Sequence, residues 1–120
     1  MKETGAPPAV CTRFHKAIEL IGRRWSGAII FVLLRSPRAR FAEIRDAIPA
    51  MTDRMLSERL QELEKEGVVV RTVIPETPVR VEYSLTKKGR ALVPAVDALI
   101  EWAHKWVEGD EGEPSRKRRK

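Results

Sequence analysis

Polar side chains with different hydrogen-bonding abilities gather between residues 52 and 61 of the sequence. Leu56, Leu60 and Leu63 recur at the spacing of an amphipathic helix and would form its buried stripe. The polar side chains that lie away from this stripe or at the start of the helix are Thr52, Asp53, Arg54, Ser57, Glu58 and Gln61. These residues donate and accept hydrogen bonds, but they do not pair a nucleophile with a base as a catalytic site does. The chemistry they indicate is therefore recognition.

The first turns of this helix suit the edges of base pairs in double-stranded DNA. Arg54 can donate two hydrogen bonds to guanine, Gln61 can pair with adenine, and Ser57 can bond a base or a phosphate. Basic side chains that can contact phosphate lie on the flank of the helix and around the preceding segment: Arg59, Arg38, Arg40 and Arg45. Asp53 and Glu58 repel phosphate, and any one of these side chains can equally be an ordinary solvated residue.

The hydrophobic pattern predicts the elements that position these side chains. Helices are expected over residues 12–21, 25–35, 42–47 and 53–66, with a very short strand at Arg40 and Phe41. The second helix is apolar almost all round, so we expect it at the centre of the fold. Thr52 is suited to cap the fourth helix, and Gly22 and Gly67 to end the first and fourth. A segment rich in β-branched residues predicts a strand over 68–74, and alternation of apolar and polar residues predicts a second strand over 79–85. Thr86 then caps a last helix over 87–107.

Two short helices joined by a tight turn and followed by a hairpin form a winged helix-turn-helix, a mainly α fold with a small β-hairpin wing. This position in the fold favours DNA recognition for the helix over 53–66 as a unit. Pro75 and Pro78 stiffen the tip of the wing, and Arg80 just beyond it can enter a minor groove. Arg71 and Lys87 can contact the DNA backbone. Alternatively, the hairpin only covers the core and Arg80 is solvated.

The last helix carries a hydrophobic seam with spacings of four, three, four and three residues, which is typical of helix pairing. The seam consists of Leu92, Val96, Leu99, Ala103 and Trp106. Together with Phe14 and Ile18 of the first helix, it predicts a homodimer through the first and last helices. The alternative is that the seam packs inside its own domain. Pro94 lies within this helix and should bend it.

Composition limits the classes of function that remain. The 120 residues suit one domain over 11–107, with a flexible arm at 1–10 and a disordered charged tail at 108–120. The net charge is +6, but the five basic residues at 116–120 leave only +1 for the rest of the chain. A DNA partner must therefore be argued from where the charges lie. The tail either adds sequence-independent phosphate contacts or only aids solubility.

Several other classes of protein find no support in the residues present. No run of eighteen apolar residues and no secretory signal is seen, so we expect a cytoplasmic protein at the nucleoid, without a membrane. His15 and His104 are far apart, and no metal-ligand cluster, nucleophile–base pair or glycine-rich phosphate loop occurs. We therefore expect no enzyme, no metal and no cofactor. One cysteine, Cys11, cannot form an internal disulfide.

The sequence between about residues 11 and 106 resembles the HxlR family of winged-helix regulators, which are relatives of the MarR type. The residues that carry the resemblance are Cys11, IELIG at 18–22, Trp25, RFAEI at 40–44, MLSERLQELE at 55–64, Gly67, PETPVRVEYSLT at 75–86, Gly89 and Trp102. Arg23 and Arg24 stand where the family usually has Gly-Lys. The resemblance implies a homodimer that regulates nearby promoters through the helix beginning at Thr52 and through the wing.

The resemblance also implies a role for Cys11, because a cysteine before the first helix senses electrophiles or oxidants in some members. Cys11 lies near a helix N-terminus, with Arg13 and Lys16 close in sequence. The alternative is a small side chain buried at the dimer interface. We thus expect a homodimeric, sequence-specific DNA-binding regulator, with repression favoured, an inverted-repeat operator and a small-molecule or oxidant effector. The alternatives are a winged helix that binds protein or RNA, or nonspecific architectural DNA binding.

Overall fold

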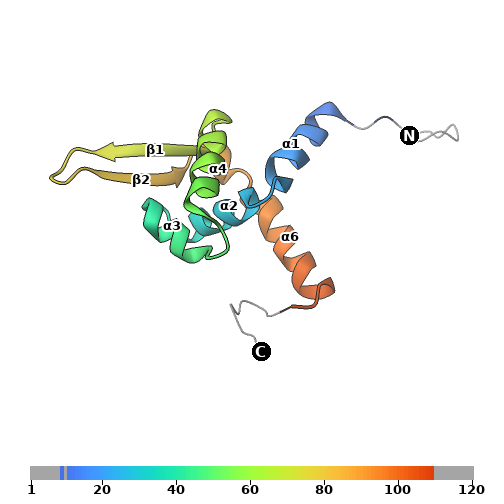
Figure 1. Ribbon diagram of the computed structural model, residues 1–120. Helices are drawn as coiled ribbons and strands as arrows, with labels where there is room; N and C mark the ends of the chain where they lie inside the picture. The colour runs from blue at the N-terminus through green and yellow to red at the C-terminus, as the bar shows by residue number, and fades with distance from the viewer. Residues whose placement is uncertain (1–8, 10, 110–120) are drawn as a thin grey trace, which may run out of the picture.

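The computed structural model describes residue 9 and residues 11–109, and it consists of six helices and one hairpin (Figure 1). In chain order the elements are α1 (Thr12–Gly22), α2 (Ser26–Arg35), α3 (Phe41–Ala47), α4 (Asp53–Lys65), β1 (Val69–Ile74), β2 (Arg80–Leu85), α5 (Lys87–Arg90) and α6 (Val93–Trp106). The expected arm at 1–10, apart from residue 9, and the basic tail at 116–120 lie outside the described residues. This element order confirms the expected winged helix-turn-helix.

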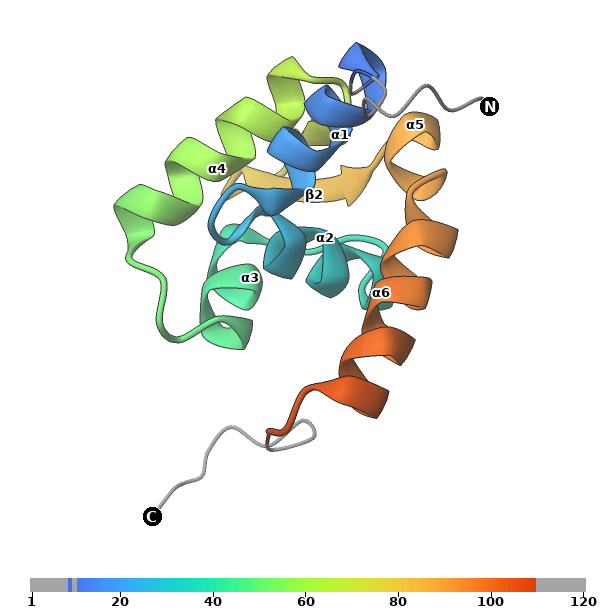
Figure 2. The same ribbon diagram turned by 90° about the vertical axis from the view of Figure 1, so that its right-hand side faces the viewer.

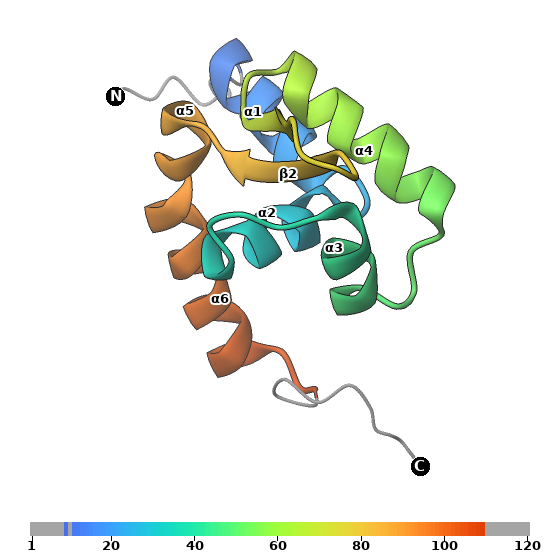
Figure 3. The same cartoon turned by 90° about the vertical axis from the view of Figure 1, so that its left-hand side faces the viewer.

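The core forms around α2, which lies among α3, α4, the hairpin and α6 (Figures 2 and 3). Ile29, Ile30 and Leu33 of α2 are buried, as the apolar character of this helix predicts. Phe31 is 37% exposed, so α2 is not covered on every side. The remaining core side chains come from the neighbouring elements: Ala39, Ile44, Ile48, Met51, Leu56, Leu60, Leu63, Val68, Val69, Tyr83 and Leu85.

Local capping fixes both ends of α4. The Thr52 hydroxyl accepts a hydrogen bond from the backbone N–H of Met55 at 3.1 Å, which confirms the predicted N-cap. Gly67 follows the helix with φ 77°, a left-handed conformation that favours glycine. Between α3 and α4, the Met51 N–H donates to the Ile48 carbonyl at 3.0 Å and closes the tight turn. The helix that carries the polar side chains is therefore held at its start, its end and along its leucine stripe.

The hairpin pairs β1 with β2 in antiparallel register from Val69–Leu85 to Ile74–Arg80. A short extra pairing occurs at Ala39, whose N–H and carbonyl bond the backbone of Tyr83 at 3.0 and 2.8 Å. The expected strand at Arg40 and Phe41 is therefore wrong. Phe41 begins α3, and the Arg40 N–H is bonded instead by the Glu43 carboxylate at 2.8 Å.

The expected single helix over 87–107 is two helices, because the chain leaves the helical path between Arg90 and Val93. Pro94 explains the break, since its ring has no N–H and would clash with the carbonyl of Arg90 in a continuous helix. In the first turn of α6 the missing N–H costs nothing. α5 also lies very close to Val68, the residue before β1: a Cβ atom on Gly89 would clash with the Val68 carbonyl.

Candidate DNA interface

The polar side of α4 is open to solvent while its leucine side is closed. Leu56, Leu60 and Leu63 are at most 1% exposed. Ser57 is half-buried, and the other polar residues predicted from the sequence are exposed: Thr52, Asp53, Arg54, Glu58 and Gln61. The start of α4 lies across the body from α5 and α6 (Figure 3). The structure therefore brings these side chains together on one accessible surface, which we call the α4 surface.

Carboxylates hold two arginines at the α4 surface. The Arg54 Nε lies 3.2 Å from a Glu58 carboxylate oxygen, one helical turn away on the same helix. The Arg45 Nη1 of α3 lies 3.6 Å from the Asp53 carboxylate at the start of α4. The Arg54 side chain is 87% exposed, so its ion pair is weak and can be exchanged for another partner. Asp53 also suits the positive end of the helix dipole.

Arg38 and Arg40 flank the start of α3 and are both exposed. Neither side chain forms an ion pair with another residue among those that the structure describes. Their positive charge is thus available to a phosphate group, as the sequence predicts.

The wing carries Arg80 between two carboxylates. Its Nη2 lies 3.1 Å from Glu76 at the tip, and its Nε lies 3.2 Å from Glu82 on the same strand. The side chain is 31% exposed, so it is less free than a solvated arginine. Arg71 and Lys87 are exposed. The hairpin projects from the body on the side opposite to α1 and α6 (Figure 1).

α1 and α6 have no buried residue and present an apolar surface to solvent. Phe14, Leu99 and Trp106 are each at least 60% exposed, and Ile18 is 46% exposed. Leu92 and Val96 instead pack against the core, and Ala103 is half-buried. The predicted seam therefore divides: its first residues stabilise the domain, and its later residues are uncovered. Exposed apolar surface of this extent typically marks an interface.

Cys11 lies directly before α1, at the N-cap position, and is exposed. Its carbonyl accepts the first hydrogen bond of the helix from His15 at 2.9 Å. The thiol is thus accessible in the chain as it stands.

Comparison with known proteins assigns the family. The sequence profile described as HxlR-like helix-turn-helix matches residues 20–111. The chain belongs to the HxlR family. Among its relatives, the HTH-type regulator YvaP of Bacillus subtilis (strain 168), whose function is uncharacterized, is 52% identical over 82% of this chain and 91% of its own length. The regulator YodB of the same organism is 46% identical over 82% of this chain and 88% of its own.

Solved structures of similar regulators agree with the fold. Reduced YodB from B. subtilis has a TM-score of 0.75 at 45% identity and covers 85% of this chain and 100% of its own. The redox regulator HypR in its oxidized form has a TM-score of 0.75 at 36% identity and covers 81% of this chain and 99% of its own. The chain is therefore an HxlR-type, MarR-like DNA-binding transcriptional regulator with a winged helix-turn-helix.

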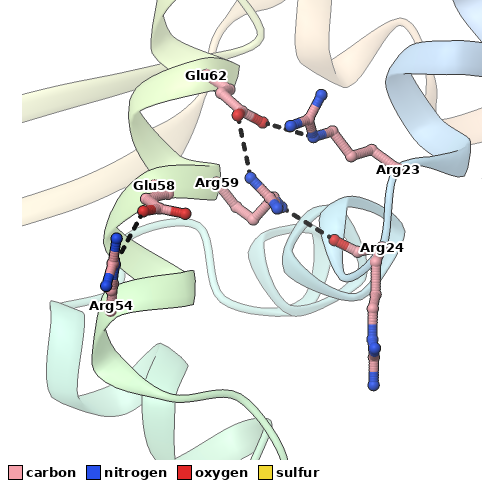
Figure 4. Close-up of polar contacts among 6 residues, drawn as sticks. All are labelled: Arg23, Arg24, Arg54, Glu58, Arg59 and Glu62. Atoms are coloured by element: carbon pink, nitrogen blue, oxygen red, sulfur yellow. Dashed lines mark hydrogen bonds and ion pairs between the residues drawn. The ribbon is translucent and has the colours of Figure 1, made fainter.

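Arg59 does not lie on the exposed flank of α4, where its position in the sequence would place it. The Arg59 side chain is only 15% exposed, because it points toward the turn between α1 and α2 (Figure 4). Its Nε donates to the Arg24 carbonyl at 3.2 Å, and its Nη1 lies 3.0 Å from Glu62. Sequence reasoning placed Arg59 on the flank of the helix and missed Glu62, because helical spacing does not say which other segment lies beside that flank. The structure gives Arg59 a place inside the domain rather than on the α4 surface.

Within residues 9 and 11–109, no group of three or more His, Cys, Asp and Glu side chains is placed to hold a metal ion. In the same residues no helix is both long and apolar enough to cross a membrane.

Proposed function

We propose that this HxlR regulator acts as a homodimer on an inverted-repeat operator and represses the promoters that contain it. The observation that carries the proposal is the placement of two different surfaces on one domain. The α4 surface is polar and open. The helices α1 and α6, which carry exposed apolar side chains, lie on the side of the body away from the hairpin (Figure 1), and α6 lies across the body from the start of α4 (Figure 3). A two-fold dimer through α1 and α6 would place two recognition helices about 34 Å apart, one turn of the DNA helix.

In this proposal each side chain of the α4 surface has a distinct role. Arg54, Ser57 and Gln61 contact base edges in the major groove. The N-terminus of α4, capped by Thr52, receives a phosphate through its free N–H groups. Arg38 and Arg40 bind the flanking phosphates. Asp53 and Glu58 do not contact DNA directly. They hold Arg45 and Arg54 in position until DNA replaces them as partner.

Arg80 would enter the minor groove beside the recognition helix, where a narrow groove attracts arginine. To do so it must leave Glu76 and Glu82. We therefore expect the wing contact to form only where the minor groove is so narrow that its attraction for arginine exceeds the loss of these two ion pairs.

The proposal is tested by selecting bound fragments of genomic DNA in vitro and titrating the selected operator against random DNA at physiological salt. We expect a palindromic sequence, and operator binding at least about a thousandfold tighter than to random DNA. Equal affinity for both would favour architectural binding, and no binding to duplex DNA would favour a protein or RNA partner. Sedimentation equilibrium on the same sample tests the dimer.

A response to oxidants or quinones at Cys11 is the second proposed activity. It is supported by the exposure of the thiol at the start of α1, a helix of the proposed interface. It is supported also by similar proteins, since HypR is a redox regulator and YodB has been solved diamide-treated and quinone-bound. With a single cysteine in the chain, a disulfide at Cys11 can only join two subunits or link Cys11 to a small thiol, and a quinone would add to the thiolate.

A further inference from the structure

The direction of α1 relative to the rest of the domain is fixed by few apolar contacts. The helix has no buried residue, and only Leu20 and Ile21 in its last turns pack partly against the core. The chain then turns sharply at 23–25 before α2 begins. Something other than core packing must therefore hold α1 at a defined angle.

Charged side chains join this turn to the recognition helix. Glu62 of α4 lies 3.1 Å from the Arg23 Nε and 3.0 Å from the Arg59 Nη1. The Arg59 Nε also donates to the Arg24 carbonyl at 3.2 Å (Figure 4). We call these groups the turn cluster: Arg23, Arg59, Glu62 and the Arg24 carbonyl. Because Arg59 is largely shielded from solvent, its two bonds are stronger and more directional than those of an exposed ion pair.

The turn itself is held in an unfavourable conformation. Trp25 has φ 76°, a left-handed value that bulky residues rarely adopt. Its indole N–H is buried and has no hydrogen-bond partner among the described residues. A conformation of this kind persists only where neighbouring contacts fix it. The Arg59 bond to the Arg24 carbonyl, one residue before Trp25, is such a contact and comes from α4.

We infer that Arg23, Arg59 and Glu62 are positioning residues that set the spacing of operator half-sites, an inference that rests on the proposed function. α1 carries part of the proposed dimer interface, together with α6, and α4 reads the DNA. The angle between α1 and α4 therefore contributes to the distance between the two recognition helices. α1 has 11 residues and is about 16 Å long. A rotation of about 12° at the turn would move its far end by about 3.4 Å, the rise of one base pair.

The inference is tested on the selected operator and on versions whose central spacer is longer or shorter by one base pair, with affinity measured by fluorescence anisotropy. The wild type should lose affinity by about tenfold or more on the altered spacers, as for a mismatched base pair. Glu62→Gln and Arg23→Ala should bind all three spacers within about threefold of one another. Arg23→Ala is the second variant because Arg23 is on the surface and its loss leaves the core intact.

Two control variants isolate the cluster from general charge effects. Arg24→Ala removes the same positive charge as Arg23→Ala, but the Arg24 side chain points away from Glu62 and lies over the Trp25 ring (Figure 4). Glu64→Gln removes a carboxylate from the same helix. Both controls should keep the spacing preference of the wild type, and sedimentation should show that all variants are dimers.

The outcomes separate the two proposals. If the wild type prefers one spacer and Glu62→Gln and Arg23→Ala keep that preference, the inference is overturned while the proposed function stands. The same holds if Arg24→Ala broadens the preference as much as Arg23→Ala. If the wild type binds no inverted repeat, the proposed function fails, and this inference fails with it.

Discussion

Replacing Arg54 by alanine tests whether the α4 surface reads bases or only binds phosphate. In the free protein the side chain is 87% exposed, and it forms an ion pair with Glu58 at 3.2 Å. A helical pair of this spacing stabilises a helix by about 0.2–0.5 kcal/mol. Arg54→Ala should therefore leave thermal unfolding almost unchanged, so that a change in DNA affinity reports on the interface.

The expected loss of affinity depends on the DNA sequence. A bidentate arginine–guanine contact discriminates by about 1–3 kcal/mol, and a symmetric dimer would lose two such contacts. Operator affinity should fall by about 2–6 kcal/mol if the two half-sites are independent. Affinity for random DNA should fall less, because only one positive charge per subunit is removed. The Glu58 carboxylate, no longer paired with Arg54, adds some repulsion of phosphate on every sequence alike.

The measurement is the ratio of operator to random-DNA affinity for the wild type, Arg54→Ala and Arg54→Lys. Lysine keeps the charge without the two-pronged donor, so Arg54→Lys should retain the salt dependence of the wild type and lose most of the specificity ratio. If Arg54→Ala weakens binding to every sequence equally, or Arg54→Lys keeps the full ratio, Arg54 is a phosphate contact and the base-reading argument is wrong.

Three other substitutions probe the remaining parts of the account. Gly89→Ala should lower the free energy of unfolding by about 1–3 kcal/mol, because its Cβ would meet the Val68 carbonyl. Thermal denaturation checks this, and Gly22→Ala, with no atom near its Cβ, should be neutral or slightly stabilising. Leu99→Glu should give a folded monomer in sedimentation equilibrium, while His104→Glu, which helical spacing places away from Leu99, should remain a dimer. A dimer of unchanged stability with Leu99→Glu would exclude this interface. Cys11→Ser should keep operator binding and lose any response to diamide or quinones in the anisotropy assay, and an unchanged response would remove Cys11 as the sensor.

Most of the fold was predictable because its signals are local. The Thr52 N-cap, the leucine stripe of α4 and the left-handed Gly67 are each determined within a few residues, and the structure confirms all three. Local sequence patterns did not predict the contacts between segments that are distant in the chain. Ala39 rather than Arg40 pairs with Tyr83, and that partner is far along the chain. The sequence around residues 39–41 does not indicate which of these residues will pair with a strand so far along the chain.

The turn after α1 shows a second limit. Gly22 was expected to end the first helix, as a left-handed glycine often does at a helix C-terminus. α1 does end at Gly22, but the residue with the left-handed conformation is Trp25. Contacts from α4 reach this turn, and the sequence of the turn contains no sign of them. The same contacts place Arg59 inside the domain. One long-range contact, between the Arg59 guanidinium and the Arg24 carbonyl, thus explains why Arg59 is not on the exposed flank of α4. The same contact joins α4 to the turn that contains Trp25.

The arrangement of charges explains how a body with little net charge can still select DNA. Several arginines near the proposed interface already have a carboxylate partner: Arg45 with Asp53, Arg54 with Glu58, and Arg80 with Glu76 and Glu82. A phosphate at a random site must displace that partner, and the exchange of one anion for another gains little free energy. A guanine edge that accepts two directed hydrogen bonds from Arg54 gains more than the exposed pair loses. Paired arginines therefore weaken nonspecific binding more than specific binding, so near-neutrality of the body favours discrimination between sequences.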